Sequence, residues 1–167
     1  MGLKLGYQFC LESVEAVVSR AAEYGNFVRI DMEDHQCTDD TFRLYFDLRR
    51  RHENLGVAIQ AYLRRTIRDI EPLAEAKANL RICKGIYGEP RAVVYKNRAI
   101  IINNFALLLE KLASAGCYVG IATHCEEVIW HAERIIRRLG LTRDRYEFQM
   151  LLGVEPELRR LLVKQGH

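Results

Sequence analysis

The chain has 167 residues, of which 49% are hydrophobic and 28% are charged. These proportions are typical of a globular protein and exclude a disordered or fibrous chain. Lys and Arg outnumber Asp and Glu by only 25 to 22, and acidic residues alternate with the paired arginines, so a nucleic-acid partner is not expected.

Short apolar segments rich in β-branched residues are expected to form buried strands. In chain order they are residues 26–30, 56–59, 80–83, 117–121 and 147–151. The segments between them have helical periodicity. The clearest apolar stripes are Leu11, Val14, Val18 and Ala21, then Ile101, Phe105, Leu108 and Leu112. This alternation predicts a parallel sheet covered by helices, in a single domain over residues 1–167.

Polar residues follow the predicted strands at or near their carboxyl ends. They are Asp31, Gln60, Lys84, Thr123, His124 and Gln149. An open doubly wound sheet gathers its ligand groups at one switch point, whereas a closed β/α barrel collects them from several strands around a common mouth. We therefore expect an α/β fold of the (β/α)8 TIM type. A complete barrel needs about 250 residues, so the chain is expected to be a partial barrel of about five βα units.

A partial barrel leaves two sheet edges open, and open edges are sites of pairing and aggregation. A complementing chain or a homo-oligomer would cover them. The chain contains five cysteines, an odd number with no C-x-x-C pair and no secretory leader, which favours the cytoplasm. No stretch approaches the roughly 18 apolar residues of a membrane helix, so any contact with a membrane is expected to be peripheral.

Asp31 comes directly after an apolar strand. An acid at a barrel mouth can orient a cationic partner or act as a base. The alternative is that Asp31 caps the next helix. Better-placed caps are Asp34, Thr38, Asp39 and Asp40.

Arg81 lies on a mostly apolar strand, where it shares one face with Cys83 while Ile82 and Lys84 share the other. Burying an arginine is costly unless it is paired or faces a ligand. An Arg81 that points into the barrel, with Asp31 as a neighbour, satisfies this condition. Gly85 permits a close approach of the backbone to a ligand. The alternative is that Arg81 and Lys84 form a structural ion-pair network.

The remaining strand ends carry side chains of mixed hydrogen-bonding character. The amide of Gln60 both donates and accepts, which suits a planar heterocycle. Thr123 and His124 close the fourth strand, where a histidine can bind a phosphate, a ribityl hydroxyl or a metal. Gln149 on the fifth strand has the same options, and each of these residues taken alone is more often structural.

Two other chemistries use residue types that this chain contains. Metal ligand types are present, but no H-x-H, H-E-x-x-H or C-x-x-C spacing places two ligands on one element. Lys84 could form a Schiff base, as in barrel aldolases. Neither alternative has further support, and no Rossmann, P-loop or hydrolase-elbow motif occurs in the chain.

Five motifs taken together resemble the proline dehydrogenase family, particularly its single-function bacterial members. They are NFVRIDMED (26–34), QAYL (60–63), RICKGIY (81–87), ATH (122–124) and EFQMLLGV (147–154). The resemblance extends from about Met1 to His167. It implies an FAD-dependent barrel in which L-proline is oxidised to 1-pyrroline-5-carboxylate, with electrons passed to a membrane quinone at the inner face of the membrane.

By motif match, the resemblance places Asp31 and Arg81 at the catalytic positions of the family. The residues that it places against FAD are Met32, Gln60, Lys84, Gly85, Ile86, Thr123 and His124, with Gln149 as an addition. Two departures from the family pattern affect the surroundings of the flavin. Cys125 replaces a polar or acidic residue, and Cys83 replaces the commoner valine.

The resemblance also indicates segments that the chain lacks. Met1-Gly2-Leu3 resembles the stretch after the second strand of the family, so the strand with an active-site lysine is expected to be missing, and Lys4 is not that lysine. The last strand and the arginine pair that binds the proline carboxylate would follow His167. The alternative to a catalytic fragment is therefore an inactive remnant, or one half of a split barrel that needs another chain.

Overall fold

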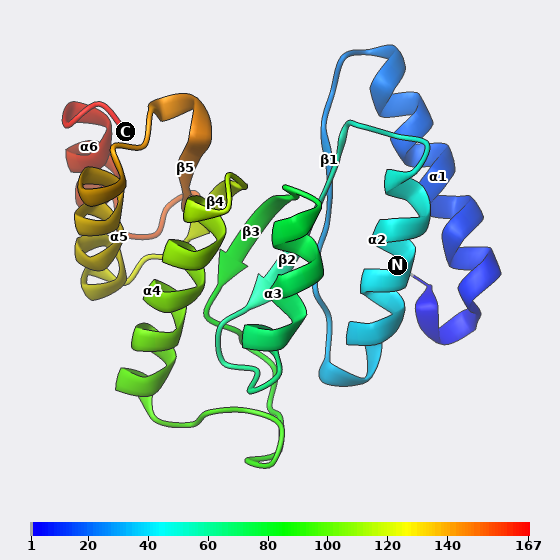
Figure 1. The fold of residues 1–167 in the computed structure, drawn as a ribbon, viewed down its shortest axis with the longest axis horizontal. Coiled ribbons are helices and arrows are strands. Elements are labelled where there is room, and N and C mark those ends of the chain that lie inside the picture. Colours follow the sequence, from blue (N-terminus) through cyan, green and yellow to red (C-terminus); the bar gives the residue numbers. More distant parts are fainter. Residues whose placement is uncertain (1) are drawn as a thin grey trace. The chain divides into compact units, whose positions relative to one another are not determined.

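The computed structural model describes residues 2–167, so Met1, where the resemblance begins, lies outside the described residues. Strands and helices alternate along the chain (Figure 1). The strands are β1 (Val28–Ile30), β2 (Leu55–Gln60), β3 (Asn79–Cys83), β4 (Tyr118–Ala122) and β5 (Tyr146–Gln149). The helices are α1 (Tyr7–Glu23), α2 (Thr38–Arg49), α3 (Thr66–Glu75), α4 (Arg98–Ser114), α5 (Glu126–Leu139) and α6 (Pro156–Lys164). The strand order is β1-β2-β3-β4-β5, which confirms the predicted α/β class with five parallel strands.

The chain divides into two compact units, one that ends at Ala58 and one that spans Ile59–His167. The single domain over residues 1–167 stays a prediction. In the first unit β1 pairs in parallel with β2, in a register that places Ile30 opposite Val57. Helices α1 and α2 lie side by side there (Figure 1). Leu44, Tyr45 and Leu48 of α2 are fully buried, so this unit has its own small core.

The second unit contains the parallel pairs β3–β4 and β4–β5, with Arg81 opposite Gly120 and Ala122 opposite Gln149. Burial alternates along β3, where Leu80 and Ile82 are buried and Arg81 is partly exposed. This alternation is the period-2 pattern of a strand. It confirms that Arg81 and Ile82 lie on opposite faces.

Helix α4 covers this sheet with the predicted residues Phe105, Leu108 and Leu112, all fully buried. Ile102 is buried in place of Ile101. Ile101 instead packs against a small cluster outside the sheet that is formed by Tyr62, Leu63 and Val94. The predicted stripe is therefore correct except at its first position, because a loop competes with the sheet for contact with this end of α4.

Local chemistry sets where the helices of this unit begin. The side-chain oxygen of Asn97 accepts hydrogen bonds from the backbone N–H groups of Ala99 (2.9 Å) and Ile100 (3.2 Å), the usual N-cap arrangement. Helix α5 has glutamates in its first turn and arginines in its last, which complement the helix dipole.

Candidate functional site

A cavity of about 510 Å³ lies at the carboxyl ends of β3, β4 and β5. It is lined by Arg81, Ala122, Thr123, His124, Phe148, Gln149, Met150 and Leu151. Four of the residues predicted from the sequence therefore lie together, from three different strands. Their functional roles stay predictions.

Arg81 is held in this cavity by a line of hydrogen bonds across the sheet. Its Nε donates to Oε1 of Gln149 at 2.6 Å, and Nε2 of Gln149 donates to Oε1 of Glu147, also at 2.6 Å. A charged donor makes a stronger bond than a neutral one. The guanidinium is therefore oriented by β5 before any ligand arrives.

Gly120 leaves space for the hydrogen bonds that join Arg81, Gln149 and Glu147. A Cβ on Gly120 would lie 2.6 Å from Nε2 of Gln149, and Gly120 is the register partner of Arg81 on the neighbouring strand. Only a residue without a side chain lets the Gln149 amide cross β4 to reach Arg81. Neither Gly120 nor Glu147 was predicted from the sequence. The signal that could have found Gly120 is a glycine inside an apolar strand, which often marks a close approach.

Thr123 and His124 shape the loop that follows β4. The Thr123 hydroxyl, which is buried, accepts a hydrogen bond from the Cys125 N–H at 3.0 Å. Nε2 of His124 accepts one from the Leu151 N–H at 2.7 Å. An accepting Nε2 carries no proton, so the ring proton of the neutral imidazole is on Nδ1. His124 thereby ties the segment after β5 to the end of β4.

Gln60, Lys84, Gly85 and Ile86 do not line this cavity. Gln60 is buried at the end of β2. Lys84, Gly85 and Ile86 begin the loop after β3, in which Gly85 has φ +104° and the Ile86 side chain is 88% exposed. The structure thus places Gln60 as a buried amide and the other three residues in a loop in which Lys84 and Gly85 are partly buried and Ile86 is exposed.

Asp31 and Met32 belong to the first unit. Asp31 is exposed directly after β1, and Met32 is buried with only 6% of its surface accessible. Position at a strand end is therefore confirmed for Asp31. Its pairing with Arg81 and its catalytic role stay predictions.

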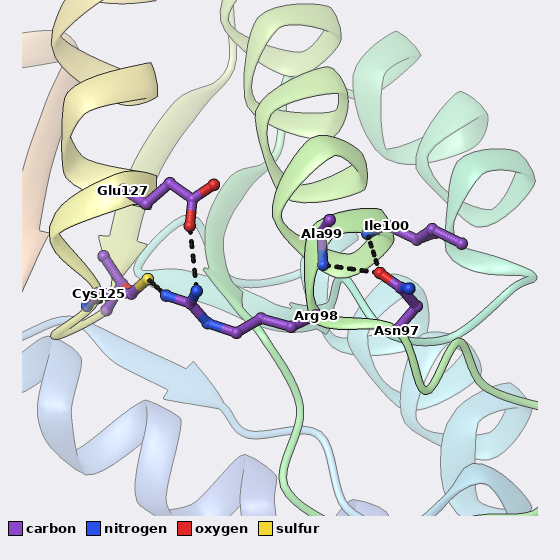
Figure 2. Close-up of polar contacts among 7 residues, drawn as sticks. Asn97, Arg98, Ala99, Ile100, Cys125 and Glu127 are labelled. Atoms are coloured by element: carbon purple, nitrogen blue, oxygen red, sulfur yellow. Dashed lines mark hydrogen bonds and ion pairs between the residues drawn. The ribbon is translucent and has the colours of Figure 1, made fainter.

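Cys125, one of the departures from the family pattern, begins α5 next to two cations. Figure 2 shows Arg98 of α4 between Cys125 and Glu127. Nη2 of Arg98 lies 3.2 Å from the Cys125 sulfur, and Nη1 lies 3.2 Å from the Glu127 carboxylate. Burial by itself raises the pKa of a thiol, but the Val128 N–H and the charges of Arg98 and Lys84 hold the pKa of Cys125 below its ordinary value. Arg98 was not predicted from the sequence.

A second cavity, of about 490 Å³, lies between α4 and α5 on the helical side of the unit and contains His131 but none of the predicted site residues. Within residues 2–167, no three His, Cys, Asp or Glu side chains are grouped so that they could hold a metal ion. Across the same described range, no helix is both long and apolar enough to span a membrane.

Comparison with known proteins decides which family this arrangement belongs to. The family model for proline dehydrogenase matches residues 1–167. The chain belongs to the proline dehydrogenase family. Proline dehydrogenase 1 of Bacillus subtilis subsp. natto is 34% identical over 167 residues, which are 100% of this chain and 55% of that protein. The proline dehydrogenase of Deinococcus radiodurans is 34% identical over 164 residues, 97% of this chain and 53% of that protein. The chain thus spans about half the length of these relatives of the proline dehydrogenase family, and the predicted family is confirmed.

Solved structures agree on the fold. Proline utilization A from Bdellovibrio bacteriovorus matches with a TM-score of 0.89 and 24% identity, over 96% of this chain and 19% of that one. A Bradyrhizobium japonicum proline utilization A mutant matches with a TM-score of 0.82 and 21% identity, over 94% of this chain and 18% of that one. These likenesses support the predicted α/β fold class.

Proposed function

We propose that this chain forms the flavin-facing part of an FAD-dependent proline dehydrogenase. The observation that carries the proposal is the cavity in which Arg81, Thr123, His124 and Gln149 meet at three strand ends. Several strand ends around one cavity is the arrangement of a β/α-barrel active site. Membership of the family supplies the reaction that such a site would perform.

The residues present fit a flavin. A flavin ring has apolar faces and an edge of donors and acceptors, and binding sites for such groups combine apolar walls with a few fixed polar groups. The cavity provides Phe148, Met150 and Leu151 as apolar walls. Arg81 and Gln149 provide an oriented guanidinium and amide.

The loop after β3 fits a flavin as well. In this loop Gly85 has φ +104°, and Ile86 is an apolar side chain left 88% exposed. Lys84 adds a positive charge next to Gly85, which suits the phosphates or ring oxygens of FAD. These features support the assignment of Lys84, Gly85 and Ile86 to the flavin together with the cavity residues. We assign Gln60, which is buried at the end of β2, to the same group.

The protein's share of the reaction is orientation and electrostatics. FAD, when bound, would accept a hydride from the ring carbon of L-proline, and loss of a proton from the ring nitrogen would complete the oxidation to 1-pyrroline-5-carboxylate. We assign Arg81 and Asp31 to the catalytic group, and Met32 to the flavin contacts. In this proposal a membrane quinone takes the electrons at a peripheral membrane contact, and other polypeptide supplies the groups that bind the proline carboxylate.

Titration of the purified chain with FAD tests the proposal, with flavin fluorescence and visible absorption as readouts. We expect His124→Ala to weaken FAD binding roughly tenfold, because losing one well-placed polar group in a site costs about 1.4 kcal/mol. His131→Ala, in the cavity between α4 and α5, is the matched control and should change the affinity less than about twofold. Equal effects of the two variants would contradict the site.

Turnover is tested separately, by adding polypeptide that spans the remaining half of a relative and measuring proline-dependent flavin reduction. We expect reduction only in the completed mixture, since orientation of the carboxylate needs groups outside this chain. Binding of FAD without reduction in any mixture would favour an inactive remnant. A chain that never binds FAD would overturn the proposal.

A further inference from the structure

Tyr62 and its neighbours contact the loop after β3 near both of its ends. Near the start of the loop, the Ala61 N–H donates to the Cys83 carbonyl at 2.8 Å and the Tyr62 N–H donates to the Lys84 carbonyl at 2.9 Å. Near its end, the Tyr95 N–H donates to the Tyr62 carbonyl at 2.8 Å. Both backbone groups of Tyr62 are therefore used to hold residues 84–95 in place.

Further backbone and side-chain contacts hold the far end of this loop. Leu63 and Val94 form an antiparallel bridge, and both are buried with Tyr62 in one cluster. Nε of Arg64 donates to the Arg91 carbonyl at 2.9 Å. An amide network of this kind resists opening more than a solvent-exposed loop does.

The ring of Tyr62 lies against Gly85. A Cβ on Gly85 would overlap the ring atoms of Tyr62, so the ring occupies the volume that any other residue at position 85 would need. Gly85 has φ +104°, a conformation that L residues rarely adopt. The Tyr62 ring therefore requires a glycine at position 85, and the positive φ of this glycine sets the direction of the backbone toward Ile86.

The hydroxyl of Tyr62 is buried under the same loop. Burial, with the negative charge of Glu89 as the second cause, raises the pKa of Tyr62 to about 12. Glu89 is itself buried, with 7% of its surface accessible. The phenol therefore stays neutral at physiological pH, and its ring lies against Gly85.

We propose that Tyr62 is a positioning residue, which sets the backbone conformation of Lys84, Gly85 and Ile86 in which these residues meet the flavin. The proposal rests on the proposed flavin site and deepens it. Tyr62 acts through the loop and does not itself touch the cofactor. Its ring, rather than its hydroxyl, is the part that the loop needs.

Three variants of the 167-residue chain test this. Tyr62→Leu removes the aromatic plane, Tyr62→Phe keeps it, and Phe105→Leu shortens a fully buried aromatic residue of α4 as a control for lost stability. Amide hydrogen exchange is measured at residues 62, 89 and 95 and, as the internal reference, in β4. FAD affinity and the visible spectrum of the bound flavin are measured on the same proteins.

In Tyr62→Leu we expect exchange at these three amides to rise at least fivefold relative to β4, FAD affinity to fall, and the spectrum of bound flavin to shift. Tyr62→Phe should restore all three readouts to those of the parent chain. Phe105→Leu should speed exchange in β4 and in the loop together, without a spectral shift.

Unchanged loop exchange in Tyr62→Leu would overturn the proposal. So would faster loop exchange with unchanged FAD affinity and spectrum, since the loop conformation would then be irrelevant to the flavin. A parent chain that binds no FAD contradicts the proposed function instead. In that case the exchange of residues 62, 89 and 95 still decides whether Tyr62 sets the loop.

Discussion

The loop after β3 and the segment after β5 both leave the sheet at strand carboxyl ends, but they are held very differently. Residues 84–97 are tied to residues 61–64 by backbone hydrogen bonds near both ends. In the segment after β5 (residues 150–155), the Leu151 N–H donates to the His124 side chain, and the Leu151 and Leu152 side chains are 68% and 90% exposed.

This difference shows how one sheet end can present both a preformed and an adaptable surface. Backbone hydrogen bonds to a neighbouring loop are insensitive to side-chain identity, whereas the hydrogen bond from Leu151 to His124 depends on one side chain. We expect the loop after β3 to keep its shape when ligands are absent. The segment after β5 should order further when other polypeptide covers its leucines.

The largest effect is expected at Gly85. In Gly85→Ala the new Cβ overlaps the Tyr62 ring and the residue keeps a strained positive φ, so we expect a loss of about 3 kcal/mol in the free energy of unfolding. Urea denaturation measures it. Gly88→Ala, at a glycine with open space around it, is the control and should cost less than about 1 kcal/mol.

The double variant Gly85→Ala with Tyr62→Ala sharpens the first prediction. Removing the ring relieves the overlap but leaves the strained φ, so the double variant should be more stable than the sum of the two single losses by about 1 kcal/mol or more. Strict additivity would show that the ring and the glycine do not contact each other.

A smaller effect is expected at Gly120. Gly120→Ala places a Cβ 2.6 Å from Nε2 of Gln149 and should displace that amide from Arg81. We expect a loss of about 1.5–2 kcal/mol, the lower part of the range for a hydrogen bond to a charged group. Gln149→Leu removes the same hydrogen bond without changing β4, so it should lower the free energy of unfolding by a similar amount. If only Gly120→Ala lowers it, the effect comes from the backbone of β4 rather than from the hydrogen bond to Arg81.

His124 is expected to matter only to its own segment. In His124→Ala the Leu151 N–H loses its acceptor, which costs about 1 kcal/mol. Hydrogen exchange at the Leu151 amide should accelerate roughly fivefold, while exchange at the Tyr95 amide stays unchanged. Equal acceleration at Tyr95 would mean that the two regions open together. That result would contradict the inference that the loop after β3 and the segment after β5 are held independently.

The smallest effect concerns the Cys125 thiol. Its pKa is lowered, so its thiolate fraction at neutral pH exceeds that of Cys117, whose pKa is raised by burial to about 11. Iodoacetamide should therefore label Cys125 before Cys117, because the thiolate is the nucleophile. Arg98→Met removes a cation from the sulfur, raises the pKa, and should slow labelling about twofold to fivefold.

Glu127→Gln is the matched control for this labelling, because it removes the other partner of Arg98 while the contact between Arg98 and the sulfur is retained. Labelling should change little in that variant. An equal slowing in both variants would assign the effect to helix α5 as a whole rather than to the cation at the thiol. Peptide mass spectrometry identifies the labelled cysteine in each case.

Local pattern in the sequence was enough for most of the fold. The strand that carries Arg81 was predicted at 80–83 and lies at Asn79–Cys83, because apolar alternation and β-branched residues act over a few neighbours along the chain. The stripe on α4 was wrong at Ile101, which turns to Tyr62 and Val94. That preference depends on a loop whose path is not encoded in the periodicity of the helix.

By itself, the sequence determined the alternation of strands and helices, the face on which Arg81 lies, and the placing of polar residues at strand ends, since each of these follows from spacing along the chain. Tertiary structure alone decided that Gln149, 68 residues away, bonds Arg81 across Gly120, and that the Tyr62 ring packs on Gly85. Such contacts depend on strand register and loop path, which are set by the packing of the whole unit rather than by any one segment.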